Sequence, residues 1–222
     1  EFLLHPRQIR HFIRAKEIFL GIFLRNFKDG VVATGLGRQP VAAAFMWGGT
    51  LHRPSRRQQD GGGDSHGTLM LDHLFIGALV THAAIEDGAL PDVTKGMMIH
   101  VASGIAYRAV RNRGTIGGSI AHADPAGDWP AALLALGAEV VIDGPNGTRE
   151  MAIADFQIDA FTVALEAGEI LRGFRVPILS DAARWGYHKI SRKPGDFADS
   201  IGAFVCDSRS GVARLVLGAT DG

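Results

Sequence analysis

Residues 111–128 read RNRGTIGGSIAHADPAGD, and the fold of the chain is organised around this stretch. Glycines alternate there with two hydroxyl side chains, and a histidine and two aspartates follow. Because glycine has no Cβ, its backbone can pass close to a ligand and turn N–H groups toward it. The stretch therefore predicts an anion-binding segment between two helical segments.

The residues after this stretch predict a helix and then a hairpin. Asp128 is a good N-cap for a helix over 130–136, which carries proline in its first turn and ends at Gly137. A strand over 138–142, a Gly-Pro-Asn-Gly turn and a returning strand over 148–151 come next.

The residues before the stretch predict a buried strand and two helices. The strand covers 74–79, Thr81 caps a short helix, and Pro91-Asp92 starts a second one. The apolar face of the second helix consists of Met97, Met98, Val101, Ala102 and Ile105. We interpret its methionines as core residues.

Strands dominate the last third of the chain. They are expected at 170–176, 185–190, 201–206 and 212–217, which gives an α+β order rather than a repeating βαβ one. The last three strands have no helix after them to cover a face of their sheet. The C-terminus therefore reads as truncated.

The N-terminal third differs in character from the rest. Residues 7–27 space apolar side chains at helical intervals, whereas 35–67 read as loop or disorder. Near Leu74 the pattern changes abruptly. We predict a divergent or out-of-frame segment over 1–73, one lobe over 74–180 and the start of a C-terminal subdomain over 181–222.

The composition fits a soluble globular protein, with 46% apolar residues and a net charge of zero. No apolar run reaches the roughly 18 residues of a membrane helix, and no secretory pattern is present. These features predict a cytoplasmic protein with no membrane span, and no nucleic-acid-binding module is recognisable. The single cysteine, Cys206, reads as a buried small hydrophobe, and any iron–sulfur cluster must be on a partner.

Familiar catalytic and nucleotide-binding motifs are missing. The sequence has no Walker loop, no complete Rossmann fingerprint, no His-Glu-x-x-His pair and no Gly-x-Ser-x-Gly elbow. His122, Asp124 and Asp128 are suitable metal ligands within seven residues. Against a metal, Asp124 suits a turn before proline and Asp128 suits a helix cap. A metal-dependent enzyme therefore stays an alternative hypothesis.

Between Leu74 and Gly218 the chain carries a series of recognisable segments in a fitting order. They are Ile76–His82, residues 111–128, Pro130–Ala138, Ala154–Phe156, Gly168–Leu171, Val176–Pro177 and Tyr187–Ala198. This series resembles the FAD-binding subunit of molybdenum-containing hydroxylases, as in the medium subunit of aerobic carbon monoxide dehydrogenase and the flavin domain of xanthine dehydrogenase.

The resemblance implies a two-lobed FAD-binding domain of the PCMH type, followed by a three-stranded C-terminal subdomain. It implies an oxidoreductase component that takes electrons from iron–sulfur clusters and passes them to an outside acceptor. Its partners would be an iron–sulfur small subunit and a molybdopterin large subunit. Flavin suits this role because it accepts one or two electrons.

The resemblance also assigns residues to the cofactor. Backbone N–H groups of Thr115, Ile116, Gly117 and Gly118, with the Thr115 hydroxyl, are expected to meet the phosphates. Further FAD contacts are carried over to Ser119, His122 and Asp124, and Asp128 is expected to hydrogen-bond the cofactor's hydroxyls. Ile170 and Leu171 match an apolar pair near the flavin or adenine rings, and Lys189 matches a basic position on the isoalloxazine side.

The family has a second, earlier phosphate loop, for which this chain offers only Trp47-Gly-Gly-Thr50. The distance from Gly48 to Ile76 is short for the family, and the composition between them is wrong. Residues 1–73 are therefore either a divergent lobe or sequence translated out of frame. In the second case the chain is a non-catalytic remnant of the family with an incomplete FAD site.

Overall fold

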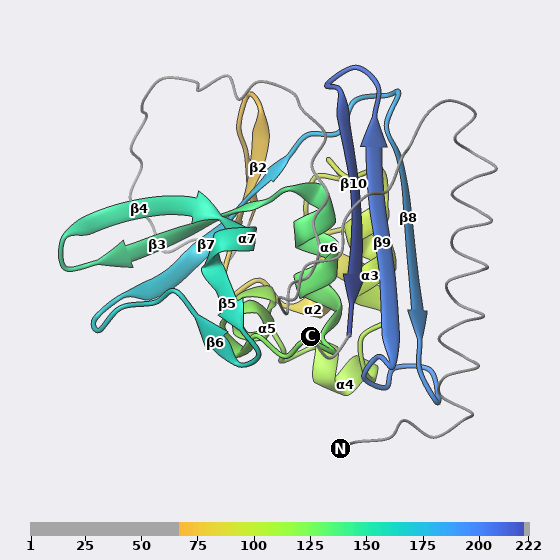
Figure 1. Ribbon diagram of the computed structural model, residues 1–222, viewed down its shortest axis with the longest axis horizontal. Coiled ribbons are helices and arrows are strands. Elements are labelled where there is room, and N and C mark those ends of the chain that lie inside the picture. The colour runs from red at the N-terminus through yellow and green to blue at the C-terminus, as the bar shows by residue number, and fades with distance from the viewer. Residues whose placement is uncertain (1–66, 220–222) are drawn as a thin grey trace, which may run out of the picture. The chain divides into compact units, whose positions relative to one another are not determined.

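The computed structural model describes residues 67–219 (Figure 1). The larger sheet has five antiparallel strands in the order β1-β2-β7-β3-β4. Its strands are β1 (Gly67–Leu69), β2 (His73–Gly77), β7 (Ile170–Pro177), β3 (Glu139–Gly144) and β4 (Gly147–Ala152). The predicted strands at 74–79, 138–142, 148–151 and 170–176 are confirmed within a few residues.

The second sheet has three antiparallel strands in the order β10-β9-β8. They are β8 (Arg184–Ile190), β9 (Ser200–Asp207) and β10 (Val212–Gly218). A small ribbon is formed by β5 (Gln157–Asp159) and β6 (Thr162–Val163). The helices are α2 (His82–Glu86), α3 (Met97–Ser103), α4 (Arg108–Arg111), α5 (Ile116–His122), α6 (Asp128–Leu136) and α7 (Ile153–Phe156). The mixed content confirms the α+β class and the three-stranded C-terminal sheet.

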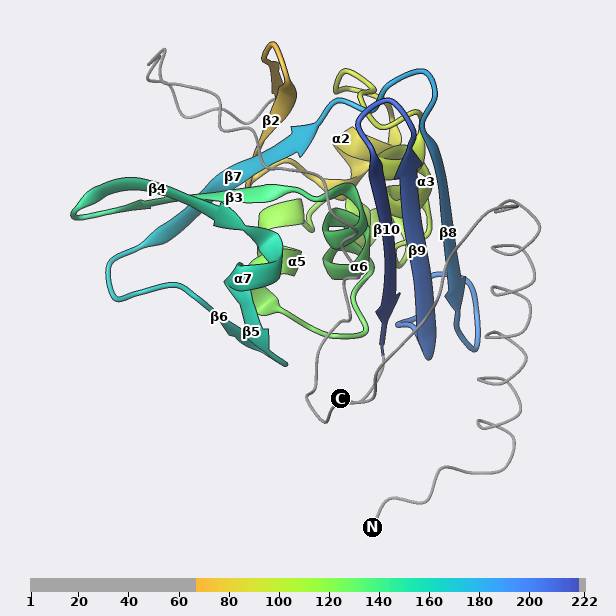
Figure 2. The same ribbon diagram turned by 45° about the horizontal axis from the view of Figure 1, so that its top comes forward.

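Helix α6 lies at the centre of the described residues, between the two sheets (Figures 1 and 2). All nine of its residues are buried, and all except Asp128 are apolar, as expected for a helix in the core. It packs against β9 and β10 of one sheet and against β7 of the other, while α3 packs against β8. The prediction that the C-terminal strands lack a covering helix is therefore wrong, because the covering helices precede those strands in the sequence.

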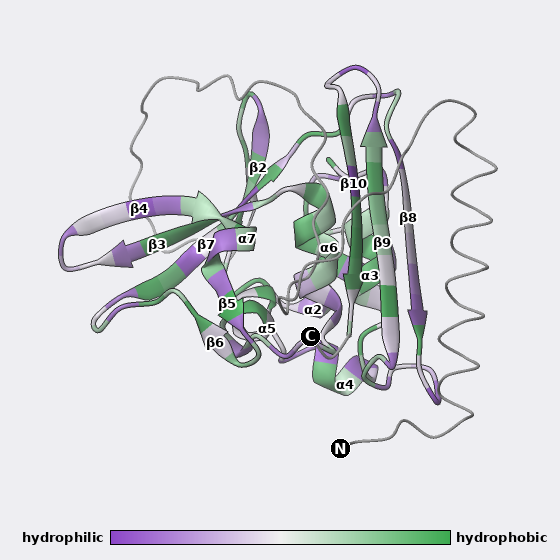
Figure 3. Ribbon diagram, in the orientation of Figure 1, coloured by the Kyte–Doolittle hydropathy of each residue, from purple (hydrophilic) through white to green (hydrophobic). Residues whose placement is uncertain are grey.

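The inner faces of both sheets are apolar, and their outer faces are more polar. On β2 and β7, Leu74, Ile76 and Phe174 point into the core. On the opposite face, Arg175 donates to Glu150 and to the His73 ring. Figure 3 shows the contrast between an apolar α6 and a more polar β8. Antiparallel sheets commonly have one packed and one solvated face.

Helix boundaries confirm some of the predicted caps. Thr81 Oγ1 accepts from Ala84 N at 3.1 Å, and Gly137 ends α6 in the left-handed region at φ +70°. The predicted cap at Asp128 is wrong, because Gly127 is the N-cap and Asp128 is the first helical residue. Helix α3 begins at Met97 rather than near Pro91, since Gly96 before it has φ +85°.

The predicted core residues are largely confirmed. Met97 and Met98 are buried, as expected for a core face on α3. Cys206 is only half-buried and lies on the opposite face of β9 from Val205, so its interpretation as a buried hydrophobe holds in part. No helix within residues 67–219 is long and apolar enough to cross a membrane.

Three predictions fall outside the described residues. They are the amphipathic helix over 7–27, nearly all of the loop over 35–67 and the glycine pair Gly48-Gly49. The domain boundary near Leu74 stays a prediction.

Candidate cofactor site

The glycine stretch folds as a helix rather than as an open loop. Helix α5 starts after Thr115, whose Oγ1 accepts from Gly118 N at 3.0 Å, and it ends at Ala123 with φ +51°. A hydroxyl residue at the N-cap compensates for the weak helix propensity of the two glycines that follow. The segment that we predicted to bind an anion therefore presents a helix N-terminus.

The first N–H groups of α5 already have partners within the chain. Ile116 N donates to Val80 O at 3.0 Å, and Gly117 N donates to Ala78 O at 2.9 Å. Gly118 N donates to Thr115 Oγ1, and Ser119 N donates to Thr115 O at 3.1 Å. In this structure these N–H groups therefore have partners within the chain, and their contact with phosphate oxygens stays a prediction.

The two glycines of α5 have different roles. A Cβ on Gly117 would lie 2.4 Å from Ala78 Cβ and 2.5 Å from Ala78 O, so this glycine allows the helix to pack on the turn after β2. A Cβ on Gly118 would meet only Thr115 Oγ1, at 3.0 Å, and the residue is exposed. Gly118 thus leaves an open stretch of backbone that a ligand can approach, which fits a bound cofactor.

Side-chain donors stand around this open backbone. The Thr115 hydroxyl accepts one hydrogen bond and keeps its own hydrogen to donate. The Ser119 hydroxyl makes no hydrogen bond to any residue within 67–219. His122 is exposed, with its ring centroid 5.1 Å from that of Phe161. Hydroxyls and an imidazole are suitable donors for phosphate oxygens.

Asp124 has a structural contact instead. Its Oδ1 accepts from Ala126 N at 2.9 Å, closing the turn that connects α5 to α6. The prediction that this residue forms a turn before proline fits that geometry. Its contact with the cofactor stays a prediction.

Exposed apolar side chains border α5. Leu79, Phe161 and Ile170 are 74%, 60% and 65% exposed, although each is large and apolar. They come from the turn after β2, the turn between β5 and β6, and the start of β7. Helix α5 packs against β6 and β7, and Phe161 N donates to Ala123 O at 2.9 Å. Ile170 is the first residue of β7, the strand that contacts α5, and half-buried Leu171 follows it. Their contact with the cofactor rings stays a prediction.

The other predicted pair, Asp128 and Lys189, is buried and bonded internally. Lys189 Nζ lies 2.9 Å from Asp128 Oδ1 and 3.0 Å from Oδ2, and it also donates to Gly104 O at 2.9 Å. Tyr187 donates its hydroxyl to Asp128 Oδ1 at 2.6 Å. The Asp128 and Lys189 side chains are 8% and 10% exposed. This cluster joins the start of α6 to β8.

Burial dominates the electrostatics of this cluster. It raises the pKa of Asp128, while the hydrogen bonds from Tyr187 and Lys189 oppose that rise. Burial and the Asp128 charge also raise the pKa of Tyr187, so its hydroxyl stays protonated and donates. We did not select Tyr187 from the sequence, although its spacing of two from Lys189 places both on one face of β8.

An open pocket of about 740 Å³ lies beside Lys189. It is lined by residues 103–104, 106–108 and 188–195 together with Arg111. The Lys189 ammonium contacts both Asp128 oxygens and Gly104 O, so its three N–H donors have partners within the chain. Lys189 is the predicted site residue that lines this pocket.

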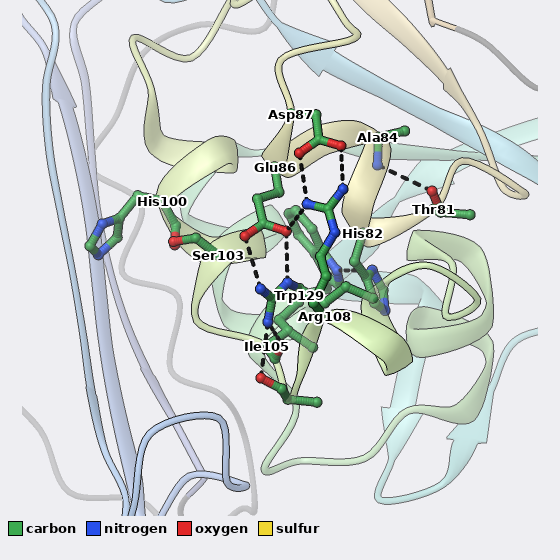
Figure 4. A network of polar contacts seen from close by, with 12 residues as sticks. Thr81, His82, Ala84, Glu86, Asp87, His100, Ser103, Ile105, Arg108 and Trp129 are labelled. Atoms are coloured by element: carbon green, nitrogen blue, oxygen red, sulfur yellow. Dashed lines mark hydrogen bonds and ion pairs between the residues drawn. The ribbon is translucent and has the colours of Figure 1, made fainter.

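The wall of this pocket is held by a network of arginines and acids (Figure 4). Arg111 binds the Glu86 carboxylate through Nε at 2.8 Å and Nη2 at 2.9 Å, and it donates to Ile105 O and Ala106 O. Ala106 has φ +41°, and a Cβ on Gly195 would lie 2.5 Å from Ala106 O. Arg111 therefore fixes a strained turn against which the β8–β9 loop packs.

The three candidate metal ligands do not form a cluster within the described residues. Within 67–219, no group of three or more His, Cys, Asp or Glu side chains is placed to hold a metal ion. His122 lies beside Phe161, and both Asp124 and Asp128 bind donors of the chain itself.

Comparison with known proteins identifies relatives. Residues 69–179 match the family described as the FAD binding domain in molybdopterin dehydrogenase. The chain is 36% identical to the nicotine 6-hydroxylase medium subunit of Paenarthrobacter nicotinovorans, over 68% of this chain and 54% of that protein. It is also 36% identical to the carbon monoxide dehydrogenase medium chain of Hydrogenophaga pseudoflava, over 62% and 48%.

A solved structure agrees with these relatives. Quinoline 2-oxidoreductase from Pseudomonas putida 86 superimposes with a TM-score of 0.64 at 33% identity, over 70% of this chain and 55% of that one. The chain spans about half the length of the relatives it matches. On the family match over residues 69–179, the chain belongs to the family of FAD-binding medium subunits of molybdenum hydroxylases.

Proposed function

We propose that this chain is the flavoprotein component of a molybdenum hydroxylase complex, passing electrons from iron–sulfur clusters on a partner to an outside acceptor. Bound FAD would supply the redox chemistry, because flavin accepts one or two electrons. The observation that carries the proposal is the family match over residues 69–179, which contain the open backbone at Gly118.

Within this proposal, the residues around α5 bind and orient the cofactor. The hydroxyls of Thr115 and Ser119 and the ring of His122 donate to the phosphates. Ile116 and Gly117 are internal supports that hold the helix against the turn after β2. Apolar contact with the rings comes from Ile170 and Leu171.

Residues farther from α5 complete the proposed site. Lys189 lines the adjoining pocket and supplies positive charge on the isoalloxazine side. Asp128 keeps Lys189 in place and accepts from a cofactor hydroxyl with its remaining lone pairs. Asp124 sets the turn between α5 and α6.

The partners follow from the chemistry. A chain with one cysteine does not offer the several thiolates that an iron–sulfur cluster requires. We therefore propose a small subunit that carries the clusters and a large subunit that carries molybdopterin, assembled in the cytoplasm. Relatives named as medium subunits or chains support such an assembly.

Titration of the purified protein with FAD tests the proposal. We expect uptake of one FAD per chain with quenching of flavin fluorescence. A folded protein that shows no saturation up to roughly 100 µM FAD would bind it with less than about 5.5 kcal/mol, and this would refute the flavoprotein role for this chain.

One observation favours the alternative of a non-catalytic remnant. The N–H groups at the start of α5 donate hydrogen bonds to acceptors of the chain itself. This lobe therefore needs no phosphate oxygens to complete its hydrogen bonding. A circular dichroism spectrum of a folded protein combined with no FAD uptake would support the remnant.

A further inference from the structure

The loop over residues 164–169 connects β6 to β7 and determines where Ile170 enters the sheet. It runs beside the β3–β4 hairpin (Figures 1 and 2). Ile170 follows it directly and is 65% exposed. A side chain that holds this loop in place therefore also holds Ile170, at the start of β7, in place.

Arg149 on β4 holds both ends of this loop. Its Nε and Nη2 each lie 2.7 Å from one oxygen of the Glu169 carboxylate, and Nη2 also donates to Ala164 O at 2.6 Å. Such a planar, two-point contact is specific to a guanidinium, which fits a carboxylate with two parallel hydrogen bonds. One side chain thus joins the first and last residues of the loop.

Glu169 continues the network inside the loop. Its Oε2 accepts from Glu166 N at 2.8 Å, and Glu169 N donates to Glu166 O at 3.0 Å. Gly144 makes room for it, because a Cβ there would lie 2.8 Å from Glu169 Cγ. The Arg149 contacts lower the pKa of Glu169 to about 2, so its carboxylate is charged at neutral pH.

We infer that Arg149 is a positioning residue for the cofactor, acting through Glu169 on Ile170 and Leu171. This inference rests on the proposed function, in which those two side chains contact the rings of FAD. Arg149 itself points toward the loop and not toward α5. Its effect on the cofactor is therefore transmitted by the backbone of residues 164–170.

The same sheet offers a matched control. Arg175 on β7 pairs with Glu150 and with the His73 ring on the outer face. Like Arg149, it is a partly exposed arginine in an ion pair. The Arg175 side chain is 28% exposed and the Arg149 side chain is 37% exposed. None of the contacts described for Arg175 involves residues 164–169. Replacing it removes one ion pair without releasing the loop.

The test compares Arg149→Met, Arg149→Lys and Arg175→Met by FAD titration, visible circular dichroism of the bound flavin and thermal unfolding. We expect Arg149→Met to weaken FAD affinity about tenfold, which corresponds to roughly 1.4 kcal/mol, and to alter the flavin dichroism. Arg149→Lys keeps the charge but loses the two-point contact, so we expect an intermediate loss. Arg175→Met should stay within about twofold of the starting protein, or roughly 0.4 kcal/mol.

The outcomes separate the inference from the function. If the unaltered protein binds no FAD, the proposed function fails and the inference fails with it. If the unaltered protein binds FAD while Arg149→Met and Arg175→Met shift the affinity equally, only the inference is overturned. A lower melting temperature of Arg149→Met with unchanged affinity and dichroism would likewise reduce Arg149 to a structural role.

Discussion

Ser119 and Asp128 lie nine positions apart in the sequence, yet the structure places them in opposite environments. The Ser119 hydroxyl forms no hydrogen bond within residues 67–219 and stands beside the open backbone at Gly118. Asp128 is buried and receives hydrogen bonds from Tyr187 and Lys189. The resemblance assigned both residues to the cofactor.

The difference separates residues available to a ligand from residues that stabilise the structure around it. Ser119 on α5 can lose its hydroxyl without leaving a buried polar atom unpaired. The buried cluster of Asp128 and Lys189 differs, because removing one charge leaves the other unpaired in a buried environment. Substitutions in the two groups should therefore affect different measurements, namely FAD affinity for one and stability for the other.

The largest effect is expected at Asp128. Replacing it with alanine leaves the Lys189 ammonium buried without its counter-ion, since Gly104 O alone remains as a partner. Losing one member of a buried ion pair costs about 3–5 kcal/mol of the free energy of unfolding. Urea denaturation followed by circular dichroism measures this loss.

A double substitution supplies the control for this result. Asp128→Leu combined with Lys189→Met removes both charges, and such replacements are often neutral or stabilising. We expect it to recover most of the stability lost by Asp128→Ala. Equal destabilisation of the single and double variants would show that the ion pair does not hold α6 against β8.

The second prediction compares the neighbouring glycines of α5. Gly117→Ala would place its Cβ against the backbone of Ala78, and we expect a loss of about 3 kcal/mol from overpacking. Gly118→Ala meets only the Thr115 hydroxyl, so its stability should be nearly unchanged. Its added methyl group instead occupies the open backbone and should weaken FAD binding. Chemical denaturation measures the stability of both variants, and FAD titration measures their affinity. A loss of stability in Gly118→Ala together with weaker FAD binding by a stable Gly117→Ala would contradict this assignment.

These glycines illustrate what the sequence could predict. A Gly-Gly pair after threonine indicated a close backbone approach, and this is correct for Gly117. The approaching group is Ala78 of the chain and not a ligand, a distinction that needs the contact between α5 and the turn after β2. Such non-local contacts leave no local signal in a single sequence.

The same reasoning explains the other differences. Thr81, Gly137 and the Gly-Pro-Asn-Gly turn act through their immediate neighbours, and the structure confirms each of them. Asp128 also has the residue type and position of an N-cap. Its carboxylate is drawn instead to Lys189, 61 positions later in the chain. Local preference was overridden there by a charge that the fold brings close.

The third prediction concerns His82, which contacts Trp129 next to Asp128 and Gly114 next to Thr115. Its Nδ1 accepts from Trp129 Nε1 at 3.0 Å, and its ring packs on Gly114, directly before Thr115. Burial and the nearby Arg111 charge lower its pKa from 6.5 to about 4. Between those values the unfolded chain binds a proton at His82 that the folded protein rejects. The stabilising contribution is therefore complete above pH 6.5 and declines as the pH falls toward 4.

His82→Gln keeps an acceptor for Trp129 but does not titrate. Each pKa unit corresponds to about 1.36 kcal/mol, and partial solvent screening reduces the total to on the order of 2 kcal/mol. We expect the starting protein to lose that much more stability than His82→Gln between pH 6.5 and pH 4. Parallel pH profiles of the two proteins would show that His82 does not carry this dependence.

The smallest effect is expected at Ser119, and it provides the sharpest test of the comparison. Ser119→Ala removes a hydroxyl that has no hydrogen-bond partner within the described residues, so the free energy of unfolding should not change measurably. A single lost hydrogen bond to a phosphate oxygen costs about 1–2 kcal/mol, which corresponds to roughly tenfold in FAD affinity. Calorimetry and FAD titration on the same sample measure both quantities. A stability loss without a change in affinity would place Ser119 with Asp128 among the residues that stabilise the fold, and the contrast between the two groups would be lost.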